Sequence, residues 1–332
     1  MSAIGIDVGG ANLKFSDGET SISVPFAMWR TPERLAESLR GCLANFAPQL
    51  PLAVTMTGEL ADCFSTKAEG VTHIVDAVCE SAESRPVAFW QTVGEFVDAD
   101  VAKEFPMLTA AANWHALATW AGRLTPRGTM LLIDVGSTTT DLIPVVDGSP
   151  MPRGRTDLER LQFSELIYLG VRRTPLCGLA TKIRWNETWI PLAREHFATT
   201  LDVGLLLGTI VEDSSDQQTA NGRAATVPEA LQRMARMFCA DLNEIPTSLI
   251  REATTQFHSV MRNELCHGLR KNLSRVEGRL SAVLTAGEGS WLAEEACRDV
   301  EIDEAFERYD LTRMIGPDHS QAACAFALSQ IF

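Results

Sequence analysis

The sequence contains no pair of cysteines at the spacing of a metal knuckle or of a dithiol redox centre. None of its eight cysteines stands in a Cys-x-x-Cys motif; they are Cys42, Cys63, Cys79, Cys177, Cys239, Cys266, Cys297 and Cys324. A zinc knuckle and a thioredoxin-like motif are therefore both disfavoured. We expect reduced thiols that are mostly buried and act as small apolar side chains.

Long apolar segments and an excess of positive charge are missing as well. No apolar run approaches the roughly 20 residues that span a bilayer, and residues 1–9 are too short and too uncharged for a secretory signal. The 29 Lys and Arg residues face 43 Asp and Glu residues, which gives a formal net charge of −14. This charge would on average repel a nucleic-acid backbone or an anionic membrane. We therefore expect a cytoplasmic protein with no nucleic-acid and no membrane partner.

What the sequence does contain is an internal repeat. IGIDVGGANLK at residues 4–14 and LLIDVGSTTTDLIPV at residues 131–145 share the string Ile-Asp-Val-Gly. In each copy an apolar run leads into an aspartate, a glycine turn and a second strand, which is the pattern of a β-hairpin. A chain of 332 residues is long enough for two domains with separate cores. The repeat therefore predicts two related lobes, each built on the same hairpin.

Strand and helix patterns follow each hairpin. Around the first copy we predict strands at 3–8, within 11–25, at 50–56 and at 86–91, and helices beginning at Thr31-Pro32, through 73–83 and at 108–122. Thr31 is the expected N-cap of its helix. Around the second copy we predict mainly helical segments over about 155–280 with an exposed loop at 212–223, then a strand at 281–286, a helix, a short strand near 311–316 and a final helix.

This order of elements predicts a two-lobed α/β protein with mixed sheets. The first lobe would span residues 1–124, and the second would span residues 125–332 with a helical insertion at about 155–280. Ligand sites favour domain interfaces. We therefore expect the site in the cleft between the lobes.

The two glycine turns are candidate phosphate-binding loops. Glycine after a strand allows a positive φ and lets a ligand approach without a Cβ in the way, and such turns present several N–H groups to one anion. The candidate residues are Gly9, Gly10, Ala11, Asn12 and Lys14 in the first copy, and Gly136, Ser137, Thr138 and Thr139 in the second. Two facing turns of this kind can hold two linked phosphates.

Asp7 and Asp134 end the two repeated strands and would lie near the same phosphates. Carboxylates beside phosphate repel it unless a divalent cation lies between them. Mg²⁺ prefers one or two carboxylates together with phosphate oxygens and water. We therefore predict a Mg²⁺ site at Asp7 and Asp134, with Lys14 as an additional positive charge.

The segments DVGGANLK, DVGSTTTDLIP and TAGEG resemble the two phosphate segments and the adenosine segment of the superfamily of acetate and sugar kinases, heat-shock chaperones and actin. Further segments resemble the hydantoinase/oxoprolinase-like family that is linked to tetrahydromethanopterin-dependent one-carbon transfer and includes archaeal methanofuran-precursor synthases. These are MTGELADCF, AANWHA, GVRRTPLCG, FATTLDV, NGRAAT and ARMFCAD. The resemblance implies an actin-like ATPase fold, which is ribonuclease H-like, with a duplicated phosphate hairpin. One segment departs from the family pattern, because NGR at 221–223 stands where Asp-Gly-Arg is expected.

The resemblance also implies an activity. It is that of a Mg²⁺-dependent transferase in methanofuran-type cofactor biosynthesis, which joins a furanmethyl diphosphate to the phenol of a glutamyl-tyramine-like acceptor and releases diphosphate. The partner is then a phosphorylated small molecule, and a homodimer is one candidate assembly. The alternative is an ATP-dependent kinase or a hydantoinase/oxoprolinase-like ATPase, with ATP as its ligand. A third reading is a nucleotide-sensing scaffold of the actin type.

A phenol with a pKa of about 10 needs a base to lose its proton at neutral pH. Asp141, Glu59 and His115 are the candidates, and the sequence does not rank them. His115 lies in an alanine-rich helix, where a buried, hydrogen-bonded role is the alternative, while Glu59 follows a strand end. The candidate nucleotide or substrate pocket is lined by Thr57, Asn113, His115, Arg172, Gly287 and Gly289.

Overall fold

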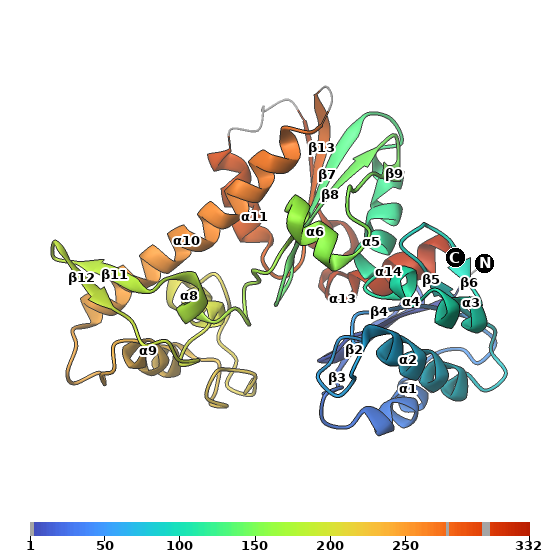
Figure 1. Ribbon diagram of the computed structural model, residues 1–332, viewed down its shortest axis with the longest axis horizontal. Helices are drawn as coiled ribbons and strands as arrows, with labels where there is room; N and C mark the ends of the chain where they lie inside the picture. Colours follow the sequence, from blue (N-terminus) through green and yellow to red (C-terminus); the bar gives the residue numbers. More distant parts are fainter. Residues whose placement is uncertain (1–2, 277–278, 301–305) are drawn as a thin grey trace.

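Two mixed β-sheets form the core of the protein (Figure 1). The computed structural model describes residues 3–276, 279–300 and 306–332. The first sheet has the order β3-β2-β1-β4-β5-β6, with β1 at Ile4–Val8, β2 at Asn12–Ser16, β3 at Ser21–Pro25, β4 at Leu52–Met56, β5 at Val87–Trp90 and β6 at Phe96–Val97. The second has the order β10-β8-β7-β13-β14, with β7 at Thr129–Val135, β8 at Thr140–Val146, β9 at Ser149–Pro150 beside β8, β10 at Leu166–Ile167, β13 at Leu280–Ala286 and β14 at Glu307–Asp310.

The two copies of the repeat occupy equivalent places in the two sheets. Strand β1 pairs antiparallel with β2 and parallel with β4, and β7 pairs antiparallel with β8 and parallel with β13. The outer strands β3 and β10 add a further antiparallel pair to each hairpin. Each sheet therefore has the ribonuclease H-like order, and two such sheets make the actin-like arrangement. The predicted two-lobed α/β fold with a duplicated hairpin is confirmed.

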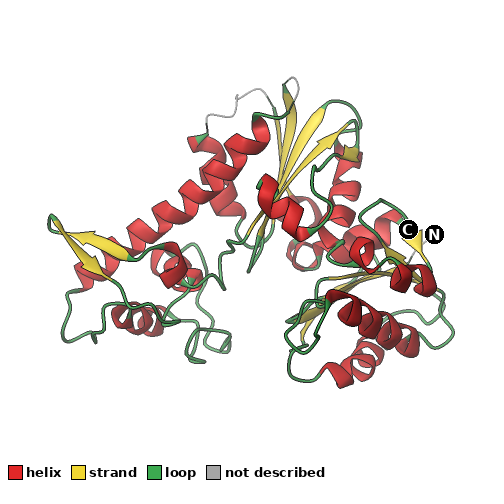
Figure 2. Cartoon of the chain, viewed as in Figure 1, coloured by secondary structure: helices red, strands yellow, loops and turns green. Residues whose placement is uncertain are grey.

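The sheets are covered by helices, shown in red in Figure 2. Their bounds are α1 Leu35–Leu43, α2 Lys67–Ser81, α3 Ala99–Glu104, α4 Pro106–Thr109, α5 Asn113–Ala121, α6 Asp157–Phe163, α7 Leu176–Leu179, α8 Thr200–Leu207, α9 Val227–Arg236, α10 Thr247–Leu273, α11 Ser290–Asp299, α12 Leu311–Ile315, α13 Pro317–Gln321 and α14 Ala323–Ile331. Two 3₁₀ turns lie at Pro32–Arg34 and Gly122–Leu124. No helix in the described part of the chain is both long enough and apolar enough to cross a lipid bilayer.

Alternation along β1 and β7 sends neighbouring residues to opposite faces. In the first sheet Ile4, Ile6 and Val8 pack against α1 and α2. In the second sheet the face with Leu131 and Ile133 packs against α10 and α11. The opposite faces of both sheets meet a shared layer made of α5 and α14.

Helices α5 and α14 contact each other and lie between the two sheets (Figure 1). Helix α5 packs on the second sheet, where Leu117 and Ala118 contact the apolar side chains of β7 and β8. Helix α14 packs on the first sheet so closely that a Cβ on Gly5 would lie 1.9 Å from the carbonyl oxygen of Ala325. The first sheet is thus covered by a helix from the other end of the sequence, whereas the second is covered by the helix that precedes β7. The division at residue 124 stays a prediction.

The insertion extends from the second sheet along the 27-residue helix α10 (Figure 1). It contains α7, α8 and α9, and the loop at 212–223 is largely exposed. It also contains a two-stranded sheet of β11 at Lys182–Trp185 and β12 at Thr188–Pro191. That sheet was not predicted from the sequence.

Three local predictions are wrong. The segment near 311–316 is helix α12, because the Asp310 side chain accepts a hydrogen bond from the N–H of Arg313 and caps it; the strand lies just before, as β14. Thr31 makes no side-chain cap hydrogen bond, since the chain there enters a 3₁₀ turn. The cysteines are not mostly buried: Cys42, Cys266, Cys297 and Cys324 are buried, Cys63 and Cys177 are partly buried, and Cys79 and Cys239 are exposed.

Candidate functional site

The two hairpin turns close with the same hydrogen bond. The N–H of Gly9 donates to the carbonyl of Asn12 at 3.0 Å, and the N–H of Gly136 donates to the carbonyl of Thr139 at 2.9 Å. The predicted positive φ does not occur at Gly9, Gly10 or Gly136. Steric crowding explains the glycine at position 9 instead, because a Cβ on Gly9 would lie 2.7 Å from the Asn12 carbonyl oxygen.

The carbonyl groups of the first turn are held by the chain that follows β3. The N–H of Met28 donates to Gly10 and the N–H of Phe26 donates to Ala11, both at 2.9 Å. These bonds hold the two carbonyl oxygens on one side of the turn. The N–H groups of Gly10 and Ala11 donate no hydrogen bond to any described residue.

The second turn is held in the same way by the segment that follows β10. Val171 donates its N–H to the carbonyl of Gly136 at 3.0 Å, while Arg172 and Arg173 donate to that of Ser137 at 3.1 and 2.9 Å. Gly170 lies so close that a Cβ there would be 2.4 Å from the backbone nitrogen of Thr138. In both turns, therefore, backbone carbonyl groups accept hydrogen bonds from the chain that packs on the turn, while backbone N–H groups remain without an acceptor in the described residues.

N–H groups without a protein acceptor are the kind of donor that can bind an anion. In the described ranges, the N–H groups of Ser137 and Thr138, like those of the first turn, have no protein acceptor. The hydroxyls of Ser137, Thr138 and Thr139 likewise make no hydrogen bond there. These residues are only partly buried. Each turn can thus present N–H donors to a phosphate, as the sequence predicts.

Asp7 and Asp134 lie at the ends of β1 and β7 and face the shared layer of α5 and α14. Asp7 is 5% exposed, and its Oδ1 has no hydrogen-bond partner among the described residues. Burial raises the pKa of Asp7 and raises that of Asp134 to about 7, and the Asp7 charge contributes to the second effect. The Asp7 charge acts on Asp134 after burial and the charge of Asp141, which have the larger effects. Asp7 and Asp134 both also raise the pKa of the Cys324 thiol on α14, after burial itself.

The cross-strand neighbours of these aspartates differ between the repeats. Lys14 stands directly opposite Asp7 on β2, whereas Asp141 stands directly opposite Asp134 on β8. Lys14 lowers the pKa of Asp7, while Asp141 raises that of Asp134. Lys14 forms no ion pair with the described residues. The second repeat therefore holds the less compensated carboxylate.

A divalent cation fits this arrangement. Two neighbouring carboxylates, one with an unpartnered buried oxygen, supply the ligands that Mg²⁺ takes from protein when phosphate oxygens and water complete its shell. Gly287, which ends β13 with φ +81°, leaves room for the Asp134 carboxylate, because a Cβ there would lie 2.5 Å from Oδ1. The residues present are therefore compatible with Mg²⁺ at Asp7 and Asp134.

The structure separates the three candidate bases. Asp141 forms an ion pair with the buried guanidinium of Arg160. His115 is buried, and burial, followed by the charges of Arg155 and Arg160, lowers its pKa to about 4. Glu59 is 1% exposed, its Oε2 has no partner within the described ranges, and burial raises its pKa to about 7.

Arg172 lies beside the second turn but is not a free anion anchor. Its guanidinium forms ion pairs with Glu288, at 2.6 Å, and with Asp216. The Asn221 side chain accepts hydrogen bonds from the backbone N–H of Arg223 and from the guanidinium of Arg233. The residue that departs from the family pattern is therefore part of the scaffold of the insertion.

Of the remaining pocket candidates, Thr57 and Gly289 lie near the ends of the repeated strands and Asn113 does not. Thr57 lies beside the first turn, where its Oγ1 would be 3.6 Å from a Cβ on Gly9. Gly289 lies beside the end of β7 and donates its N–H to the carbonyl of Val135 at 2.9 Å. Asn113 begins α5, next to Trp114, and no contact brings it to either turn in the described part of the chain.

Sequence reasoning missed a chain of charges next to the aspartates. Lys67 of α2 pairs with Asp157 of α6 at 2.9 Å, Asp157 lies 3.7 Å from Arg160, and Arg160 pairs with Asp141. The Arg160 guanidinium also lies 4.1 Å from the ring centroid of Trp114. These residues are far apart in the sequence, and only the Thr156-x-x-Glu159 capping box that begins α6 could have indicated part of the chain.

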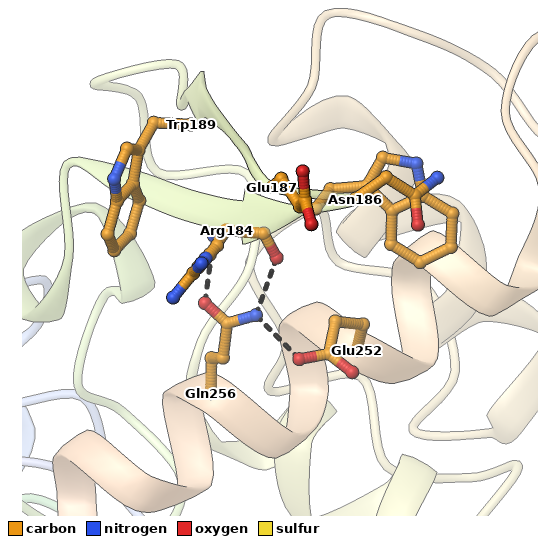
Figure 3. A pocket seen from close by; sticks show the side chains of 7 residues that line it. Arg184, Asn186, Glu187, Trp189, Glu252 and Gln256 are labelled. Atoms are coloured by element: carbon orange, nitrogen blue, oxygen red, sulfur yellow. Dashed lines mark hydrogen bonds between the residues drawn. The ribbon is translucent and has the colours of Figure 1, made fainter.

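A hollow of about 420 Å³ lies elsewhere, between the β11–β12 hairpin and α10 (Figure 3). Gln256 reaches from α10 to the backbone N–H and carbonyl of Arg184, and its amide also donates to Glu252 at 2.8 Å. Trp189 stands at one side of the hollow (Figure 3). None of the residues predicted for the site lines it.

The stability of the metal-free protein should depend on pH through Asp134. Its pKa rises from the ordinary 3.8 to about 7 on folding, so the folded state binds this proton more tightly and stability falls as pH rises through that interval. We expect Asp134→Asn to be more stable than wild type by a few kcal/mol at pH 8, and to lose this advantage below pH 4. Urea unfolding in a chelator would measure the difference, and a difference independent of pH would contradict the raised pKa.

Comparison with known proteins shows the family of this chain. A family model described as hydantoinase/oxoprolinase matches residues 52–327. A protein from Methanocaldococcus jannaschii, named (4-{4-[2-(gamma-L-glutamylamino)ethyl]phenoxymethyl}furan-2-yl)methanamine synthase, is 32% identical over 334 residues, which cover 99% of this chain and 96% of the relative. A protein of the same name from Methanococcus vannielii is 33% identical over 199 residues, or 60% of this chain and 88% of the relative.

Solved structures match at much lower similarity. The activator of 2-hydroxyisocaproyl-CoA dehydratase from Clostridium difficile gives a TM-score of 0.43 at 12% identity and covers 99% of this chain and 95% of that chain. An archaeal actin homologue gives a TM-score of 0.42 at 12% identity, with 99% and 98% covered. Likeness at this level carries no argument about function.

Proposed function

Because this chain belongs to the hydantoinase/oxoprolinase family, we propose that it is an enzyme that forms the aryl ether of a methanofuran-type precursor. The synthase names of both curated relatives support enzyme status. Those names describe a product in which a phenol oxygen bearing a glutamylaminoethyl chain is joined to the methylene of a furan that carries an aminomethyl group. The proposed substrates are the corresponding furanmethyl diphosphate and glutamyl-tyramine.

The proposed reaction is a displacement at the furan methylene carbon. The phenol oxygen forms a bond to that carbon while the bond between the carbon and the diphosphate oxygen breaks, and the electron pair leaves with diphosphate. The phenol proton passes to a base of the protein. No phosphoryl group is transferred, so the reaction needs no ATP.

One observation carries this proposal, namely that the strand of Asp7 and the strand of Asp134 each end in a turn with N–H donors that are unpartnered among the described residues. The donors of Gly10 and Ala11 and those of Ser137 and Thr138 would bind the diphosphate oxygens, where negative charge develops as the bond breaks. Lys14 adds a positive charge near the first turn. Mg²⁺ held by Asp7 and Asp134 would supply charge neutralisation of the leaving group.

The direct test is to incubate the purified protein with Mg²⁺, aminomethylfuran-methyl diphosphate and γ-glutamyl tyramine, and to measure diphosphate release and the product mass. We expect one diphosphate per aryl ether formed, with no requirement for ATP. An ATP-dependent kinase would instead bind ATP in calorimetry and release ADP with the phenol or another acceptor. ADP formation without ether formation would overturn the proposal.

A further inference from the structure

Glu59 is fixed next to the first turn by its own backbone. The N–H groups of Thr57 and Gly58 both donate to the carbonyl of Val8, at 2.9 and 3.0 Å. A Cβ on Gly58 would lie 3.1 Å from the carbonyl carbon of Gly9. The segment that leads into Glu59 therefore packs directly on the turn that would hold diphosphate.

Helix α2 fixes Glu59 from the other side. Gly70 of α2 packs against it so closely that a Cβ there would lie 2.1 Å from the Glu59 carbonyl oxygen. A residue held between a turn and a helix in this way has little freedom to move its Cα. The position of its carboxylate is therefore determined by the fold rather than by a mobile loop.

The Glu59 carboxylate is buried yet incompletely satisfied. Its Oε2 accepts no hydrogen bond from the described residues, although buried carboxylates ordinarily find donors. The charged groups that act on it are Lys67 of α2, Asp157 of α6 and Asp7 of β1, and Lys67 opposes the other two. Oε2 is therefore an acceptor without a donor in the described ranges, enclosed close to the turn that would hold diphosphate.

The other two candidates lack such an acceptor. The Asp141 carboxylate is occupied by Arg160. His115 lies beside Arg155 and Arg160, whose positive charges disfavour the imidazolium that would form if it took a proton. A base with a pKa near 7 also accepts a proton from a phenol more readily than an ordinary carboxylate does.

We infer that Glu59 is the catalytic base that removes the phenol proton; the inference rests on the proposed function. The proton moves from the phenol oxygen to Oε2 of Glu59 as that oxygen bonds to the furan methylene carbon. The released electron pair leaves on diphosphate, so the step balances without an oxidant or reductant. The protonated Glu59 then returns its proton to water.

The first test is Glu59→Gln, which keeps the shape of the side chain and removes the base. We expect turnover at pH 7 to fall by about 10² to 10⁴-fold, while Mg²⁺-dependent diphosphate binding measured by calorimetry stays within about twofold. The deficit should shrink with a ring-fluorinated phenol of lower pKa or as pH approaches 10, because the phenol then ionises without help. Retained diphosphate binding shows that the variant is folded.

The second test uses the pH dependence of the rate. Lys67 lowers the pKa of Glu59, so Lys67→Met should move the acid limb of the pH–rate profile to higher pH. Lys103→Met is the matched control. Lys103 of α3 pairs with Asp76 on the outside of α2 at 3.0 Å, so this substitution should leave the acid limb in place. A purely structural role for Lys67 would lower the rate equally at every pH.

These experiments distinguish a failure of the proposed function from a failure of the base assignment. A wild-type protein that releases no diphosphate overturns the proposed function, and the base assignment falls with it. A wild-type protein that forms the ether, together with a Glu59→Gln variant of undiminished rate at pH 7, overturns only the assignment of Glu59. An unmoved acid limb in Lys67→Met, at a wild-type maximum rate, overturns the assignment of that limb to Glu59.

Discussion

Replacing Asp134 with asparagine should weaken Mg²⁺-dependent diphosphate binding by at least about 100-fold. Loss of even an outer-shell partner reduces metal affinity by about 10 to 100-fold, and Asp134 is a proposed direct ligand. The same change should have the opposite effect in a chelator. Without metal, the charges of Asp7 and Asp134 repel diphosphate, and removing one of them leaves the N–H donors of the turns free to bind it.

Calorimetric titration of diphosphate, with Mg²⁺ and with chelator, would measure both effects. Asp7→Asn should behave like Asp134→Asn, since the carboxylates lie at equivalent positions of the two hairpins. Asp76→Asn on the outer surface of α2 is the control and should match wild type in both conditions. Weaker binding of equal size with and without Mg²⁺ would show that the aspartates shape the turns and do not hold a metal.

Replacing Arg233 with methionine should destabilise the insertion by about 3–5 kcal/mol. Arg233 of α9 pairs with Asp202 of α8 at 2.7 Å, and both side chains are 1% exposed. Without the guanidinium, Asp202 remains as a buried carboxylate that has lost its ion-pair partner. The variant also loses the hydrogen bonds from Arg233 to the side chain of Asn221 and to the carbonyl of Ala224.

Urea unfolding monitored by tryptophan fluorescence would measure this loss, since Trp185 and Trp189 lie in the insertion. Adding Asp202→Asn to Arg233→Met should restore part of the stability, because it removes the uncompensated charge. Arg223→Met is the matched control: its exposed ion pair with Glu229, at 3.5 Å, should contribute less than about 1 kcal/mol. Equal effects of the two single variants would contradict the importance of burial.

The hairpins and their aspartates could be predicted because their signals are local. An apolar run, an aspartate and a glycine within ten residues specify a strand and a turn, and the period of two places Asp7 on the same face as Gly5. The duplication then predicts that Asp134 has the equivalent place in the second sheet. The strand order of both sheets bears out this reasoning.

The ranking of the bases could not be predicted because it depends on distant residues. Asp141 is occupied by Arg160, which comes from the following helix, and Glu59 is influenced by Asp157, almost a hundred residues away in the sequence. The β11–β12 hairpin was missed. Its two turn residues, Asn186 and Glu187, both have positive φ in the structure. Asparagine at such a turn, between residues with strand propensity, was the available signal.

The late position of α14 in the sequence has a consequence for protein synthesis. The face of β1 that carries Gly5 is covered by α14, and the ribosome makes residues 323–331 long after it has made β1. The first sheet therefore emerges with one apolar side bare and stays so while most of the chain is translated. Nascent protein in this interval is expected to be a client of chaperones, and stalled translation before α14 should yield aggregates rather than an independently stable amino-terminal unit.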